Sequence, residues 1–127
     1  MRVLICGDRH WSDPLPIRRV LEWVSVDTIV IHGAAPGADS LAGDIAEELG
    51  LSVLAFPADW AKFGRAAGPK RNEQMLKEGQ PDVVVYCHDD LDKSRGTKNM
   101  VGKAVKAGLP VHNVREVVEG KTNIMSL

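Results

Sequence analysis

Residues 32–39 have the sequence His-Gly-Ala-Ala-Pro-Gly-Ala-Asp and connect an apolar run at 28–31 to a helical pattern at 41–49. Two glycines and a proline allow a tight turn between the expected strand and helix, and the small residues leave room for a ligand against the main chain. A helix that begins here directs its unpaired N–H groups and the positive end of its dipole at the loop. The segment therefore favours binding of an anion such as phosphate, although an ordinary strand-to-helix turn shares these features.

Two other segments repeat this combination of glycine and polar residues. Residues 6–9 (Cys-Gly-Asp-Arg) follow an apolar run at 2–6, and residues 95–97 (Arg-Gly-Thr) open a helical pattern behind another apolar run at 83–87. Because three loops share the same design, we favour one common ligand site over three unrelated turns.

Apolar runs and helical patterns alternate along the chain. Strands are expected at 2–6, 28–31, 51–56, 83–87 and 109–114, with four helical patterns between them. Continuous apolar runs are typical of parallel strands that are covered on both faces. The sequence therefore predicts an α/β, three-layer Rossmann-like fold with a five-stranded parallel sheet in the order 3-2-1-4-5. In this order the three loops meet at the carboxyl ends of the strands, where the winding of the sheet reverses.

The predicted domain spans residues 1–114 and is followed by a C-terminal tail at 115–127 that has no firm pattern. Three alternatives remain open for the tail: it packs as a small extra element, joins a dimer contact or is partly mobile. Residues 57–68 are expected to form one long connection, which is typical of a lid or a binding loop. Association into a homodimer is a further hypothesis.

The chain has 127 residues, a net charge of −1 and 5% aromatic residues. This charge argues against a general nucleic-acid or anionic-membrane binder, and the apolar runs are too short to span a membrane. Cys6 and Cys87 each end an apolar run and are typical of buried thiols in a reducing compartment, so we expect a cytoplasmic protein. The histidines lack the spacing of metal ligands, and we expect neither a metal nor a cofactor.

Cationic residues gather in or beside the three loops although the chain as a whole is slightly acidic. They are Arg9, Arg65, Lys70, Arg71 and Arg95. Arginine offers phosphate oxygens a rigid fork of hydrogen-bond donors. Some of these side chains are expected to be solvated, but the group as a whole favours an anionic ligand.

Several candidate residues also have a structural interpretation. Asp39 caps its helix, holds the glycine loop closed or contacts a ribose hydroxyl. His32 is a hydrogen-bonded structural imidazole or a general base. Trp11 and Trp60 stack on a base or pack under a loop. The polar loop at 88–94 favours solvated carboxylates over a divalent-ion site.

Six short motifs occur in order along the chain. They are Gly7-Asp8-Arg9-His10-Trp11, His32-Gly33 with Gly37-Ala38-Asp39, Pro57-Ala58-Asp59-Trp60, Gly64 with Ala67-Gly68-Pro69, Arg71-Asn72 with Met75, and Arg95-Gly96-Thr97 with Met100. Together, over residues 2–114, they resemble the YspA-type, YpsA-related branch of the SLOG superfamily, which is named for the Smf/DprA and Lonely-guy proteins. The resemblance implies a Rossmann-like fold that binds nucleotides or nucleotide-derived ligands.

Lonely-guy enzymes, a related branch, cleave a base from a nucleoside monophosphate and carry a catalytic Glu three positions after the Thr of a glycine-threonine motif. In this sequence that position is Met100, whereas the helix arginine of those enzymes matches Arg71. Departure of a base needs negative charge or a general base nearby. The resemblance therefore assigns no catalytic residue here, and whether the chain is an enzyme stays open.

The leading hypothesis is binding or sensing of a nucleotide-derived, phosphate-bearing small molecule of the ADP-ribose, NAD or nucleoside phosphate type. One alternative is a nucleotide-processing hydrolase of the phosphoribohydrolase type. Another is a single-strand nucleic-acid binder, against which the charge and the few aromatic residues count. The expected ligand-binding residues are Gly7, Asp8, Arg9, Trp11, His32, Gly33, Gly37, Ala38, Asp39, Arg71, Asn72, Arg95, Gly96 and Thr97.

Overall fold

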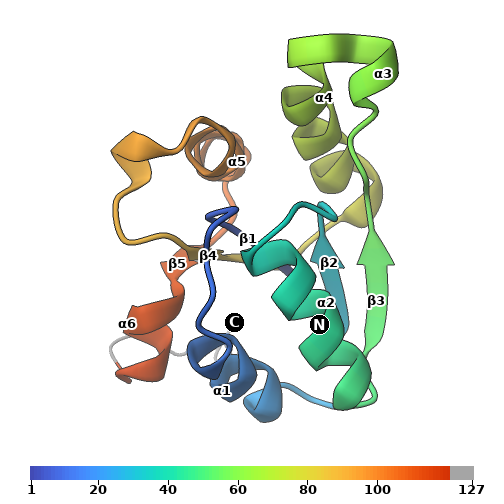
Figure 1. The fold of residues 1–127 in the computed structure, drawn as a ribbon. Helices are drawn as coiled ribbons and strands as arrows, with labels where there is room; N and C mark the ends of the chain where they lie inside the picture. Colours follow the sequence, from blue (N-terminus) through green and yellow to red (C-terminus); the bar gives the residue numbers. More distant parts are fainter. Residues whose placement is uncertain (121–127) are drawn as a thin grey trace.

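A computed structural model describes residues 1–120 and shows a five-stranded parallel sheet (Figure 1). The strands are β1 (Arg2–Gly7), β2 (Ile29–His32), β3 (Ser52–Ala55), β4 (Val83–Cys87) and β5 (Val111–Asn113). Their order, β3-β2-β1-β4-β5, confirms the predicted topology and the α/β Rossmann-like fold. The carboxyl ends of β1, β2 and β4 therefore lie side by side at one edge of the sheet.

Helices cover both faces of the sheet, which gives three layers. One face carries α1 (Leu15–Trp23), α2 (Ala38–Glu48) and α6 (Val114–Val118). The other face carries α4 (Ala67–Gln74) and α5 (Arg95–Lys106). Because successive side chains of a strand point to opposite faces, β1 contributes Val3 and Ile5 to the first core and Leu4 and Cys6 to the second.

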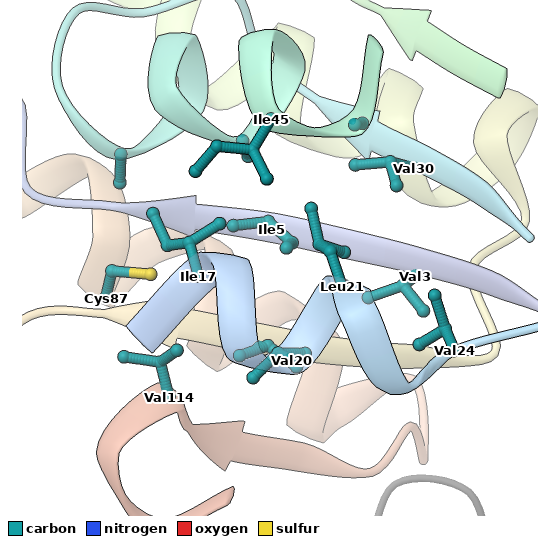
Figure 2. Packing of buried hydrophobic residues seen from close by; sticks show 14 of the residues in the cluster. Val3, Ile5, Ile17, Val20, Leu21, Val24, Val30, Ile45, Cys87 and Val114 are labelled. Carbon is teal, nitrogen blue, oxygen red and sulfur yellow. The ribbon is translucent and has the colours of Figure 1, made fainter. Parts of the chain in front are cut away.

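Figure 2 shows the core on the α1 side of the sheet. Ile17 and Leu21 of α1 and Ile45 of α2 pack there against Val3 and Ile5 of β1. None of these five side chains is more than 4% exposed. Burial of each stabilises the fold by about 1.5–3 kcal/mol, which anchors the amino-terminal half of the sheet.

The predicted long connection at 57–68 is wrong, because this segment contains regular structure. It holds α3 (Trp60–Phe63) and a 3-10 turn at Gly64–Ala66, and α4 begins at Ala67. Asp59 caps α3 by accepting a hydrogen bond from the Lys62 N–H at 3.1 Å. After α4 the chain continues as a π-helical segment, Met75–Gly79.

The helix α6 crosses the predicted boundary between residues 114 and 115. Val114 and Val117 are 0% and 2% exposed and pack in the core on the α1 side. The first residues of the predicted tail thus form a small extra element of the domain, whereas residues 121–127 lie outside the described part. Within residues 1–120, no helix is long and apolar enough to cross a membrane.

Candidate functional site

Asp8 joins the loops that follow β1, β2 and β4. Its backbone N–H donates to the Cys87 carbonyl at 2.8 Å, and its carbonyl accepts from the Ala38 N–H at 3.1 Å. The same carbonyl accepts from the Trp11 N–H at 3.1 Å, which closes the turn after β1. Since Cys87 ends β4 and Ala38 begins α2, these bonds bring the predicted loops together at one edge of the sheet.

Most glycines of these loops are required by the packing of one loop on another. A Cβ on Gly37 would lie 2.3 Å from the Asp8 carbonyl oxygen, and a Cβ on Gly33 would lie 2.5 Å from Nη1 of Arg71. Gly37 also has a φ of +79°, which residues with a side chain rarely adopt. Protein atoms therefore fill the space in the Cβ direction of these two glycines, so their lack of a side chain allows the loops to pack on one another.

Packing between loops also requires a glycine at position 7, but it does not require one at position 96. A Cβ on Gly7 would lie 2.4 Å from the Cys87 carbonyl oxygen, whereas a Cβ on Gly96 would meet no atom of the described residues within 4 Å. Of the four predicted glycines, Gly96 alone borders open space.

Asp39 closes the loop between β2 and α2 from the inside. Its Oδ2 accepts hydrogen bonds from the N–H of Gly33 at 3.0 Å and of Ala35 at 3.3 Å, and the residue is 5% exposed. Burial raises the pKa of Asp39 to about 6, although these hydrogen bonds and the nearby Arg71 act in the opposite direction. The structure thus favours the loop-closing interpretation of Asp39 over contact with a ribose hydroxyl.

Arg71 links α4 to the same loop. Its Nη1 donates to the Gly33 carbonyl, and its Nε donates to Asn72 Oδ1 at 2.9 Å. Asn72 Nδ2 in turn donates to Asn99 Oδ1 at 3.1 Å and to the Gly96 carbonyl at 3.4 Å. Within residues 1–120, Nη2 of Arg71 makes no hydrogen bond, so this half-buried guanidinium keeps a donor for an anion.

The N-termini of α2 and α5 differ in how their N–H groups are satisfied. Ser94 Oγ caps α5 by accepting from the N–H of Thr97, which is 4% exposed, whereas no side chain among residues 1–120 caps α2. In the described part of the chain, the backbone N–H groups of Asp39 and Ser40 have no hydrogen-bond partner. The start of α2 therefore combines N–H donors with the positive end of a helix dipole.

Two histidines occupy equivalent positions at the ends of β2 and β4. His32 Nδ1 accepts from the Ala34 N–H and His88 Nδ1 from the Asp90 N–H, both at 2.9 Å. The Nε2 of His32 packs against Gly43 of α2, where a Cβ would lie 2.8 Å away, and burial lowers the pKa of His32. The structure thus favours the structural interpretation of His32.

His88 is a candidate site residue that the sequence analysis did not include. Its Nε2 lies 3.9 Å from Oδ2 of Asp8, between the ends of β1 and β4. Its place just after a parallel strand, like that of His32 at the end of β2, is the signal that could have identified it.

Trp11 was predicted to line the ligand site and is buried instead. It is 7% exposed, and its Nε1–H donates to the Asp13 carbonyl at 2.7 Å. The guanidinium of Arg115 lies over the ring, 4.7 Å from its centre. The packing interpretation is therefore favoured for Trp11, whereas Trp60 on α3 is 59% exposed.

Among the five predicted cations, only Arg71 is hydrogen-bonded to the loops within residues 1–120. The others are all exposed and are Arg9, Arg65, Lys70 and Arg95. Arg9 directly follows Asp8, and Arg95 is the first residue of α5. Both side chains thus start from loops of the candidate site without contributing to its internal bonds.

Each carboxylate of the loop after β4 is paired with a cation. Asp89 accepts hydrogen bonds from Arg115, from Nε at 2.6 Å and from Nη2 at 3.1 Å. The remaining pairs are Asp90 with Lys93 and Asp92 with Lys98. These pairs support the interpretation as a solvated polar loop, and no group of three His, Cys, Asp or Glu residues within 1–120 could hold a metal ion.

Met100 occupies the position where Lonely-guy enzymes carry their catalytic Glu. It is 1% exposed and packs with Leu4 and Met75 in the core on the α5 side. This position therefore faces the core and supplies no carboxylate to the loops.

Comparison with known proteins defines the class to which this fold belongs. The model of the YspA, cpYpsA-related SLOG family matches residues 1–63, which include the loops after β1 and β2. The gene 61 protein of Mycobacterium phage D29 is 32% identical over 126 residues, and the match covers 88% of this chain and 94% of that protein. The chain belongs to the YspA, cpYpsA-related SLOG family, which confirms the resemblance seen in its motifs.

Two further similarities concern parts of longer proteins. The X-ray structure of DNA processing protein A (DprA) from Streptococcus pneumoniae matches with a TM-score of 0.72 at 17% identity, covering 88% of this chain and 49% of that chain. The chain thus spans about half the length of DprA, and this likeness shows the fold alone. The glycerol-3-phosphate dehydrogenase [NAD(P)+] of Haemophilus influenzae is 26% identical over 102 residues, covering 75% of this chain and 30% of that enzyme.

Proposed function

We propose that the chain binds a nucleotide-derived, phosphate-bearing small molecule of the ADP-ribose, NAD or nucleoside phosphate type. The observation that carries this proposal is the N-terminus of α2, where no side chain of residues 1–120 caps the helix and none of their atoms pairs with the N–H groups of Asp39 and Ser40. The Arg71 guanidinium donates to the Gly33 carbonyl of the same loop, and its Nη2 makes no hydrogen bond within residues 1–120. Backbone donors at a helix start and an arginine fork are the groups with which proteins commonly bind phosphate.

The position of the site and its relatives support the same ligand class. In open α/β sheets, ligands bind beyond the carboxyl ends of the strands, where the strand order reverses. Here that point lies between β1 and β4, next to the β2 loop. The name of the Haemophilus influenzae relative refers to NAD(P)+, a ligand that carries both phosphates and ribose.

A thermal-shift panel tests the proposal. The nucleotide probes are ADP, ADP-ribose and NAD, and the comparison compounds are adenosine and inorganic phosphate. A nucleotide that binds the folded state at a hundred times its Kd adds about 2.7 kcal/mol of stability, which raises the Tm by several degrees. We expect Arg71→Ala to abolish the shift and Arg18→Ala to retain it, because Arg18 pairs with Glu48 away from the loops.

Further measurements on the same protein sample distinguish the two alternative functions, a hydrolase and a nucleic-acid binder. Release of free base or phosphate from a bound nucleotide during long incubation would show a hydrolase. A salt-sensitive shift with oligonucleotides would show a nucleic-acid binder. A folded sample whose Tm shifts with none of the nucleotide probes would contradict the proposed function. Light scattering on the same sample tests the separate hypothesis that the protein forms a homodimer.

A further inference from the structure

Asp8 and His88 face each other where the winding of the sheet reverses. Asp8 follows β1 and His88 follows β4, and these neighbouring strands place Gly7 opposite Cys87. The Nε2 of His88 lies 3.9 Å from Oδ2 of Asp8. This separation is too long for a direct hydrogen bond, and it is of the size that one bridging oxygen atom spans.

The other hydrogen bonds of these two side chains make one a donor and the other an acceptor. Since Nδ1 of His88 accepts from the Asp90 N–H at 2.9 Å, the neutral ring carries its proton on Nε2. Oδ1 of Asp8 accepts from the His10 N–H at 2.8 Å, and Oδ2 accepts no hydrogen bond within residues 1–120. An N–H donor therefore faces a carboxylate acceptor across the gap.

The pairing of a donor with an acceptor matches a hydroxyl group better than an ionised phosphate group. A hydroxyl oxygen can accept from Nε2–H of His88 and donate its own proton to Oδ2 of Asp8. An ionised phosphate oxygen has no proton to donate, and the Asp8 carboxylate repels it. The gap therefore suits the sugar part of a nucleotide, while the start of α2 and Arg71 suit the phosphate part.

Contacts on both sides of the gap hold its two walls in place. The Asp8 N–H donates to the Cys87 carbonyl, directly before His88. On the outer side, Arg115 of α6 binds Asp89, directly after His88, and lies over the ring of Trp11. Since both loops are attached to each other and to α6, the spacing between Asp8 and His88 is set by the fold.

We propose that Asp8 and His88 bind a sugar hydroxyl of the ligand. This inference rests on the proposed function and deepens it, because it makes the ribose a recognised part of the molecule in addition to the phosphate. It adds His88 to the site and gives the Asp8 side chain a defined role as the hydroxyl's acceptor.

Calorimetric titration with ADP, 2′-deoxy-ADP and 3′-deoxy-ADP tests the subsite. We expect the wild-type protein to bind ADP about tenfold more tightly than the analogue that lacks the bridging hydroxyl, because His88 and Asp8 are then left unpaired. Asp8→Asn places an NH2 donor opposite His88, because its amide oxygen keeps the bond from the His10 N–H, and His88→Ala removes the donor. Each substitution should reduce this preference to less than about threefold. Arg18→Ala serves as the control and should keep the full preference.

The results of the titrations distinguish failure of the hydroxyl subsite from failure of the proposed function. Wild-type protein that binds ADP and both deoxy analogues equally well, or a preference that persists in both folded variants, would overturn the subsite and leave the proposed function standing. Failure of the folded wild-type protein to bind any of ADP, ADP-ribose and NAD would overturn both. If thermal denaturation shows that one variant is not folded, the other variant still tests the subsite.

Discussion

The loops after β2 and β4 begin alike and are held in different ways. In each, a histidine Nδ1 accepts the backbone N–H two residues later, and each loop leads to the N-terminus of a helix. The β2 loop is held from inside by Asp39 and Arg71. The β4 loop is held from outside by exposed ion pairs such as that of Asp89 with Arg115.

Glycine also serves different purposes in the two loops. Gly37 allows two loops to touch, whereas Gly96 borders open space at the start of α5. We infer that internal contacts make the β2 loop a rigid frame for phosphate, whereas the β4 loop is held where it leaves the sheet and is open at Gly96 within the described residues. Substitutions of Gly37, Asp39 and Arg115 test this difference between the two loops.

Gly37→Ala has the largest expected effect on the β2 loop. Its Cβ would lie 2.3 Å from the Asp8 carbonyl oxygen at a residue whose φ is +79°. We expect the free energy of unfolding, measured with urea, to fall by about 3 kcal/mol. Gly96→Ala is the matched control in the β4 loop and should change it by less than about 1 kcal/mol, in the stabilising direction. Equal losses in both variants would remove the distinction between the loops.

Asp39 makes the stability of the β2 loop depend on pH. Because burial raises its pKa from 3.8 to about 6, the folded protein binds this proton more tightly than the unfolded chain does. The resulting stability is fully present below about pH 4 and is lost as the pH rises through about 6.

Asp39→Asn cannot titrate and isolates this effect. We expect the free energy of unfolding of the wild type, relative to Asp39→Asn, to decline by up to about 3 kcal/mol between about pH 4 and pH 7. Urea denaturation of both proteins across this range measures the decline. A relative stability that increases with pH would show that the hydrogen bonds to Asp39 outweigh its burial.

Arg115→Ala has the smallest expected effect of the three, because it removes partly exposed contacts with Asp89 and Trp11. We expect a loss of about 1 kcal/mol in the free energy of unfolding. The hydrogen bond from Arg115 lowers the pKa of Asp89, so this contribution is present at neutral pH and is lost as the pH falls through that pKa. Lys98→Ala, which breaks the exposed pair with Asp92 in the same loop, should cost less than about 0.5 kcal/mol.

The sheet could be predicted because each strand corresponds to a short apolar run in the sequence. A run such as 83–87 is continuously apolar, and the structure forms β4 over those same residues. The elements that were missed are short: α3 depends on the cap from Asp59, and α6 depends on the packing of Val114 and Val117. Short helices gain most of their stability from tertiary contacts, which a local pattern does not contain.

The roles of the site residues were harder to predict than their location. Gly37 approaches Asp8, and Arg71 reaches Gly33, across 29 and 38 positions of sequence, respectively. Such contacts decide whether a glycine serves packing or leaves space, and a single sequence does not show them. The sequence leaves two interpretations open for Trp11 and for His32, and contacts of the fold decide between them: Arg115 covers the Trp11 ring, and Gly43 packs on His32.

A ¹H–¹⁵N NMR titration of the wild-type protein with ADP tests the proposed nucleotide site most directly. In this site the loops after β1, β2 and β4 act together, and the start of α2 binds the phosphate. This arrangement predicts that the largest shift changes occur at the backbone amides of Asp39 and Ser40 and in the guanidinium group of Arg71, while amides of α1 stay unchanged. Saturation with ADP that leaves Asp39, Ser40 and Arg71 unshifted would contradict it.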